Sequence, residues 1–142
     1  MAFTDTYAAS YMRSLCGQSS SAPQNQAWVG LSTTTPNADG TGFTEPSAAE
    51  YRRVCIGLAS GGSGWSNKMT VTSTSGVGTG TSNDILYFPE ALSSWGTVTH
   101  FGIFTSQTGG SAVIFGALTA PVTIQANYVP MFRAGALVLT IS

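Results

Sequence analysis

The chain has 142 residues, which is the length of one domain, and a domain of this size can bury a core without a metal or a disulfide. Only 8% of the residues are charged, against about 25% in an ordinary soluble domain. The net charge is −1 and no basic run is present, which argues against nucleic acid as a partner. The longest apolar stretches, residues 112–118 and 134–139, are far shorter than the about 20 residues of a membrane span, so no membrane partner is expected.

The N-terminal residues lack the basic and apolar regions of a signal peptide, so we expect synthesis in a cytoplasm. The two cysteines, Cys16 and Cys55, have a separation that matches no metal-ligand spacing. In a reducing compartment they are expected to be two buried free thiols.

The N-terminal segment carries the helical pattern of the chain. Tyr7, Tyr11 and Leu15 recur at four-residue steps, which places them on one helical face. We therefore predict a helix over residues 1–17, a linker over residues 18–26 and a β domain over the remainder of a single 1–142 unit.

Residues 27–142 have the alternation and the turn residues of an all-β domain. Two Gly- and Thr-containing segments, residues 33–46 and 75–83, are expected to be long loops or arms. A hairpin turn is expected at Thr108-Gly109-Gly110. About eight short strands at this spacing are typical of an antiparallel β-sandwich or jelly roll. They are expected at residues 27–32, 51–58, 68–74, 84–88, 97–105, 112–119, 122–124 and 133–141.

The residues that could perform catalysis are few and dispersed. The single histidine, His100, lies in a predicted strand, and no Gly-x-Ser-x-Gly nucleophile elbow is present. The glycines at 76, 78 and 80 lack the Lys and the following helix of a phosphate-binding loop. We therefore expect no enzyme, no catalytic residue, no metal and no cofactor.

Aromatic residues are the candidate interface residues. Trp65 and Trp95 stand in Gly- and Ser-containing sequence near strand entries, where they either cover the ends of the core or anchor a protein–protein interface. Phe43, Tyr7 and Tyr11 complete this candidate set. Sugar binding by an exposed Trp65 or Trp95 is a weaker alternative, because no polar cluster accompanies either residue.

Six blocks of strand and turn residues follow one another along nearly the whole chain. They are Trp28-Val29-Gly30-Leu31-Ser32-Thr33-Thr34-Thr35-Pro36, Glu50-Tyr51-Arg52-Arg53-Val54, Ile85-Leu86-Tyr87-Phe88-Pro89, Trp95-Gly96-Thr97-Val98-Thr99-His100-Phe101-Gly102-Ile103-Phe104, Gly116-Ala117-Leu118-Thr119 and Phe132-Arg133-Ala134-Gly135-Ala136-Leu137. This order resembles a family of small tailed-phage virion structural proteins, often labelled tail fibre proteins and similar to jelly-roll capsid cement proteins. None of the blocks is a catalytic signature.

The resemblance implies a non-enzymatic virion protein that is synthesised in a bacterial host cytoplasm. The low charge and compact size favour a capsid cement or decoration protein on the capsid exterior, bound to the major capsid protein and to copies of itself as a homo-oligomer. The family label favours the alternative of a tail fibre, baseplate or connector component bound to other tail proteins. A carbohydrate-binding module is the alternative of another class.

Overall fold

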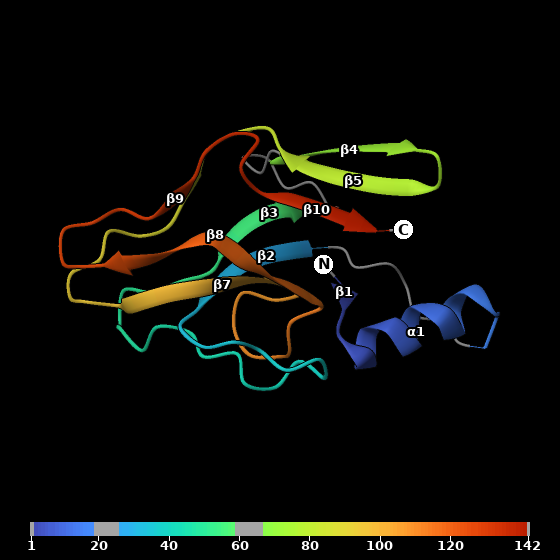
Figure 1. Ribbon diagram of the computed structural model, residues 1–142, viewed down its shortest axis with the longest axis horizontal. Helices are drawn as coiled ribbons and strands as arrows, with labels where there is room; N and C mark the ends of the chain where they lie inside the picture. Colours follow the sequence, from blue (N-terminus) through green and yellow to red (C-terminus); the bar gives the residue numbers. More distant parts are fainter. Residues whose placement is uncertain (1, 19–25, 59–66, 142) are drawn as a thin grey trace.

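The computed structural model describes residues 2–18, 26–58 and 67–141, and shows a β protein built mostly from antiparallel sheets (Figure 1). The described strands form a five-stranded sheet in the order β1-β8-β7-β2-β3, a three-stranded sheet in the order β10-β5-β4, and a two-stranded sheet of β6 and β9. In chain order the elements are β1 (Ala2–Phe3), α1 (Asp5–Leu15), β2 (Gln26–Ser32), β3 (Val54–Leu58), β4 (Met69–Thr74), β5 (Val77–Ser82), β6 (Leu86–Tyr87), β7 (Gly96–Phe104), β8 (Ile114–Ile124), β9 (Met131–Phe132) and β10 (Val138–Ile141).

One face of the five-stranded sheet carries the hydrophobic core. Successive side chains of a strand point to opposite faces, so Val29 and Leu31 of β2 share a face with Ile103 and Phe101, their partners on β7. Side chains from β6, β9 and the segment around Ala91 pack against this face. The core therefore joins the main sheet to the smaller sheets.

On the opposite face of the sheet, the loop that contains Phe43 packs against β7. Gly30 and Gly102 are direct partners across β2 and β7. A Cβ atom at Gly102 would lie 2.6 Å from the ring of Phe43, and a Cβ atom at Gly30 would lie 3.0 Å from the ring of Phe104. The two rings meet edge to face, with centroids 5.0 Å apart. The paired glycines thus make room for the aromatic side chains that cover this face.

A buried arginine fastens two loops to the same face. Arg53 donates from Nε and Nη2 to the two carboxylate oxygens of Glu45, at 2.9 and 2.8 Å. Its Nη1 donates to the carbonyl oxygens of Ser106 and Gly109, at 2.9 and 2.8 Å. The guanidinium lies 3.4 Å from the ring centroid of Phe104, a cation–π contact. One side chain therefore holds the loop before β3 and the loop after β7.

The N-terminal segment is tied to β8. The Thr4 backbone N–H donates to the Val113 carbonyl at 2.8 Å, and the buried Thr4 hydroxyl donates to the Ala112 carbonyl at 2.9 Å. Beyond α1, Gly17 has a φ of 70°, the left-handed conformation that glycine adopts readily after a helix.

The prediction of a loop at residues 75–83 is wrong. β5 occupies most of this segment and pairs with β4 on one side and β10 on the other. Ser75 and Gly76 both have positive φ and form the two-residue turn that joins β4 to β5. Because neither face of β5 is deeply buried, its sequence lacks the apolar alternation that would have indicated a strand.

Two strand boundaries near the C-terminus also differ from the prediction. The single strand β8 spans Ile114–Ile124, so it joins most of the predicted 112–119 strand to the predicted 122–124 strand. It tolerates Pro121 because the β7–β8 register shifts there. Residues 133–137 form a turn and not a strand, since Gly135 has a φ of 82° and the Ala136 N–H donates to the Arg133 carbonyl.

Candidate interface: an apolar groove

A groove of about 500 Å³ lies between the β7–β8 part of the main sheet and the segment that carries β9 and β10. Its described lining contains no charged side chain, and only Thr119 and Tyr128 bring hydroxyl groups. The lining residues are Leu31, Phe88, Val98, Phe101, Ala117, Leu118, Thr119, Ala120, Val122, Ile124, Tyr128, Pro130, Met131, Phe132, Ala136, Leu137 and Val138.

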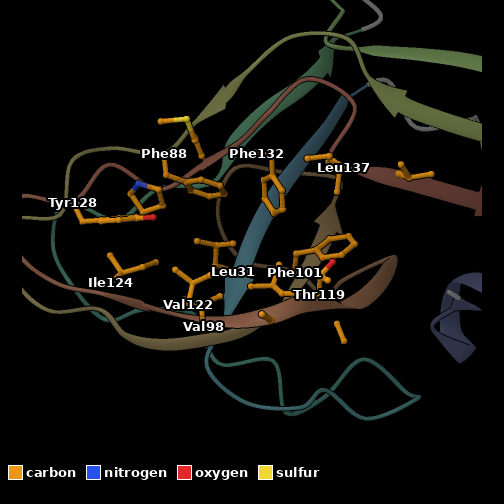
Figure 2. A pocket seen from close by; sticks show the side chains of 17 residues that line it. Leu31, Phe88, Val98, Phe101, Thr119, Val122, Ile124, Tyr128, Phe132 and Leu137 are labelled. Carbon is orange, nitrogen blue, oxygen red and sulfur yellow. The ribbon is translucent and has the colours of Figure 1, made fainter.

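Two walls face each other across the groove. Figure 2 shows Val98, Phe101 and Val122 on the side of the main sheet, and Phe132 and Leu137 on the opposite side. The sheet wall follows from the pairing of Val98 with Val122 between β7 and β8. The other wall follows from β9, which pairs with β6 and is held there as a short ribbon.

Packed aromatic rings form the inner end of the groove. Phe132 lies between Phe88 and Phe101, with ring centroids 6.2 and 6.0 Å away. Edge-on and tilted contacts at these distances are favourable. Phe88 and Phe101 are almost fully buried, so the inner wall belongs to the core.

The rim of the groove is apolar and exposed. Val122, Tyr128, Met131 and Val138 are between 37% and 47% exposed, although their side chains line the groove. Tyr87 is the strand partner of Met131 and is also exposed. Contiguous apolar surface of this kind marks sites of interaction with another protein. The groove can accept apolar side chains of a partner, and it offers no group that would compensate a buried charge.

Trp95 is buried inside the chain, with 4% of its surface exposed. Its indole Nε1 donates to Glu50 at 2.9 Å, and its ring meets Tyr51 edge to face. It therefore closes the core and offers almost no surface to a partner or to a sugar.

The other candidate aromatics do not gather around Trp95. Phe43 is half-buried against Gly102 and does not line the groove. Tyr7 and Tyr11 belong to α1, but their side chains lie outside what the structure describes, as does all of Trp65. Sequence reasoning missed the groove residues, although the apolar run from Tyr128 to Phe132 in a polar region was a usable signal.

The described carboxylates serve local hydrogen bonding. The Trp95 indole N–H, aided by the backbone N–H groups of Leu92 and Ser93, lowers the pKa of Glu50 from 4.5 to about 2. Burial, and then the charge of Glu45, raises the pKa of Tyr51 above its ordinary value. Glu50 therefore accepts the Trp95 hydrogen bond as a carboxylate, and the neutral Tyr51 hydroxyl donates to Glu45.

Other potential reactive groups are isolated in the described residues. Both cysteines are free thiols, but neither is buried as expected, because Cys16 is exposed and Cys55 is half-buried. The Nδ1 of His100 lies 2.8 Å from the Thr99 hydroxyl. Within residues 2–18, 26–58 and 67–141, no group of three or more His, Cys, Asp or Glu side chains could hold a metal ion, and no helix is long and apolar enough to cross a membrane.

Comparison with known proteins gives one family. The family model of the podophage GP4 fiber I protein gp80 matches residues 2–140. A search of curated proteins gives no match. The match confirms the resemblance to small tailed-phage virion proteins, and because it spans nearly the whole chain, this protein belongs to the family of the podophage GP4 fiber I protein gp80.

Proposed function

We propose that this protein is a non-enzymatic subunit of a phage tail fibre, and that it binds other virion proteins through the apolar groove. The observation that carries the proposal is the family match over residues 2–140, because the family description names a fibre. A virion structural role is what the family supports in general terms. The family name favours a fibre subunit over the capsid cement protein that the low charge and small size of the chain suggested.

The groove is consistent with a subunit that functions in an assembly. A monomer with exposed apolar surface and few charges is prone to association. The proposed partners are other tail proteins and further copies of this chain. The core shared by the main sheet and the smaller sheets supports a β-sandwich or jelly-roll architecture as part of this proposal.

The test is to locate the protein in the intact particle. Purified virions would be labelled with gold-conjugated antibody against this chain, and heads without tails would be labelled in parallel. We expect gold on the tail fibres and none on isolated heads. Gold distributed over isolated heads would contradict the fibre proposal and favour a capsid decoration protein.

A further inference from the structure

Among the described residues, β4 is an edge strand without the usual protection against pairing with another chain. It spans six residues, Met69–Thr74, and none of them is charged or a proline. It pairs with β5, and all of its side chains beyond Met69 are exposed. Figure 1 shows β4 at the upper margin of the molecule, outside β5. Natural edge strands are usually protected by Lys, Pro, a bulge or short length.

The other edges of the described sheets have such protection. The outer edge of β8 is partly covered by β1 and interrupted by Pro121. β10 has only four residues. The Ile56 carbonyl of β3 already accepts a hydrogen bond from the Lys68 N–H at 3.0 Å. By comparison, β4 is the longest unprotected edge among the described strands.

The hairpin register determines which backbone groups of β4 face outward. Thr74 pairs with Val77 across the two-residue turn, so these two residues exchange hydrogen bonds. Pairs alternate along the ladder, and therefore Thr72 and Thr70 also bond to β5. The backbone groups of Met69, Val71 and Ser73 point away from β5. The Met69 N–H donates to the Asn67 side chain at 3.1 Å, which agrees with this outward direction.

We propose that β4 pairs in antiparallel orientation with β4 of a second copy of this chain, with Val71 opposite Val71 of that copy. In this register the outward groups of Met69 meet those of Ser73, and each such pair exchanges two hydrogen bonds once the Met69 N–H is released from the Asn67 side chain. Thr70 then lies opposite Thr72, a favourable cross-strand pair. Two three-stranded sheets become one continuous sheet across a two-fold axis.

Charge and exposure favour a second copy as the occupant. Both strands are uncharged, so no like charges meet when the edges join. The nearby cation Lys68 is paired with Asp84 at 2.7 Å and is thereby compensated. Val71 is 74% exposed, and the symmetric register covers it with its own counterpart.

The test uses the proposed register, in which Val71 of one copy lies directly opposite Val71 of the other. In Val71→Lys, like charges would stand directly opposite each other, as they would in Val71→Glu. We expect the wild-type chain to form dimers in sedimentation velocity runs up to about 100 µM. Each charged variant should dissociate at least about tenfold more readily, and an equimolar mixture of the two should dimerise again. Val71→Thr is the matched control, because it keeps the edge and introduces no charge.

Hydrogen exchange provides a second measurement on the wild-type chain. The amides of Val71 and Ser73 should become protected as the protein concentration rises. A monomeric wild type, a charged variant that dimerises like wild type, or a mixture no stronger than its components would each overturn the proposal. Protection that is independent of concentration would mean pairing within one chain and would overturn it as well. These outcomes leave the fibre location untouched, since that is read from labelled particles.

Discussion

Gly102 lies so close to Phe43 that adding a single methyl group at position 102 would destabilise the fold. A Cβ atom at position 102 would lie 2.6 Å from Phe43 Cε2, 3.1 Å from Phe43 Cζ and 3.3 Å from the Ala112 Cβ. Overpacking of this kind forces a ring or a strand to move. We expect Gly102→Ala to lower the free energy of unfolding by about 1–3 kcal/mol in urea denaturation.

The matched control is Gly57→Ala, because among the described residues a Cβ atom there would meet only the Asn67 Oδ1, at 3.6 Å. Its unfolding free energy should remain unchanged or rise by up to about 1 kcal/mol, since alanine restricts the unfolded chain. If both variants melted alike, the Phe43 ring would not lie where the structure places it.

Glu50 should make stability depend on acid pH. Hydrogen bonds from the Trp95 indole, followed by backbone donors, depress its pKa from 4.5 to about 2 in the folded state. A depressed carboxyl pKa stabilises the fold above the ordinary value, and this contribution is lost as pH falls toward the folded value. We expect the wild-type unfolding free energy to fall between pH 4.5 and pH 2, and Glu50→Gln to flatten this decline.

Glu90→Gln controls for the removal of an exposed carboxylate in the same region. Urea denaturation at several pH values should give that variant the pH profile of the wild type. An unchanged profile in Glu50→Gln would show that its hydrogen bonds do not favour the ionised form.

At the scale of elements, Arg53 joins segments that are distant in the sequence. The guanidinium forms a two-point contact with Glu45 and binds two carbonyls of the loop after β7. Lysine cannot reproduce this planar arrangement. We expect Arg53→Lys to lower the unfolding free energy by about 2–3 kcal/mol and to accelerate hydrogen exchange in residues 105–110.

Arg52→Lys is the matched control, because Arg52 is the exposed neighbour of Arg53. It should leave both stability and exchange within error of wild type. Equal effects of the two substitutions would show that Arg53 does not hold the loop before β3 and the loop after β7 together.

The elements that could be predicted are those whose own sequence has the composition or the alternation of a strand. Residues 27–32 and 97–105 are rich in apolar and β-branched side chains, and residues 68–74 alternate apolar and polar ones; the structure places β2, β7 and β4 there. β5 escaped prediction because its pairing partners, and not a buried face, make it a strand. Such long-range pairing is not encoded in local alternation.

The groove could not be predicted for a related reason. Val98, Val122 and Phe132 come from three separate strands, and only the folded register places them around one hollow. Trp95 was a candidate because tryptophan is frequent in interfaces, but the same ring fills a core equally well. Its hydrogen bond to Glu50 spans 45 residues and has no local signature.

At the scale of the whole molecule, the groove should decide whether the protein enters the particle. Val122→Lys places a charge on the exposed rim, where a partner would have to desolvate it. We expect this variant to fold normally by circular dichroism, and its incorporation into virions to fall at least about tenfold.

Leu92→Lys is the matched control for Val122→Lys, because Leu92 is 71% exposed and does not line the groove. Its incorporation should equal that of wild type when virions are quantified by immunoblot. Equal incorporation of both variants would remove the groove as the docking surface.

The scarcity of charge also has a kinetic consequence. With 8% charged residues and a net charge of −1, the molecule projects little electrostatic field into solution. Encounter with a partner is then not steered, and association proceeds at the slower rates typical of neutral surfaces, about 10⁵–10⁶ M⁻¹s⁻¹. The pace at which subunits join a growing particle is accordingly governed by how much protein the infected cell has accumulated, and hardly by its ionic conditions.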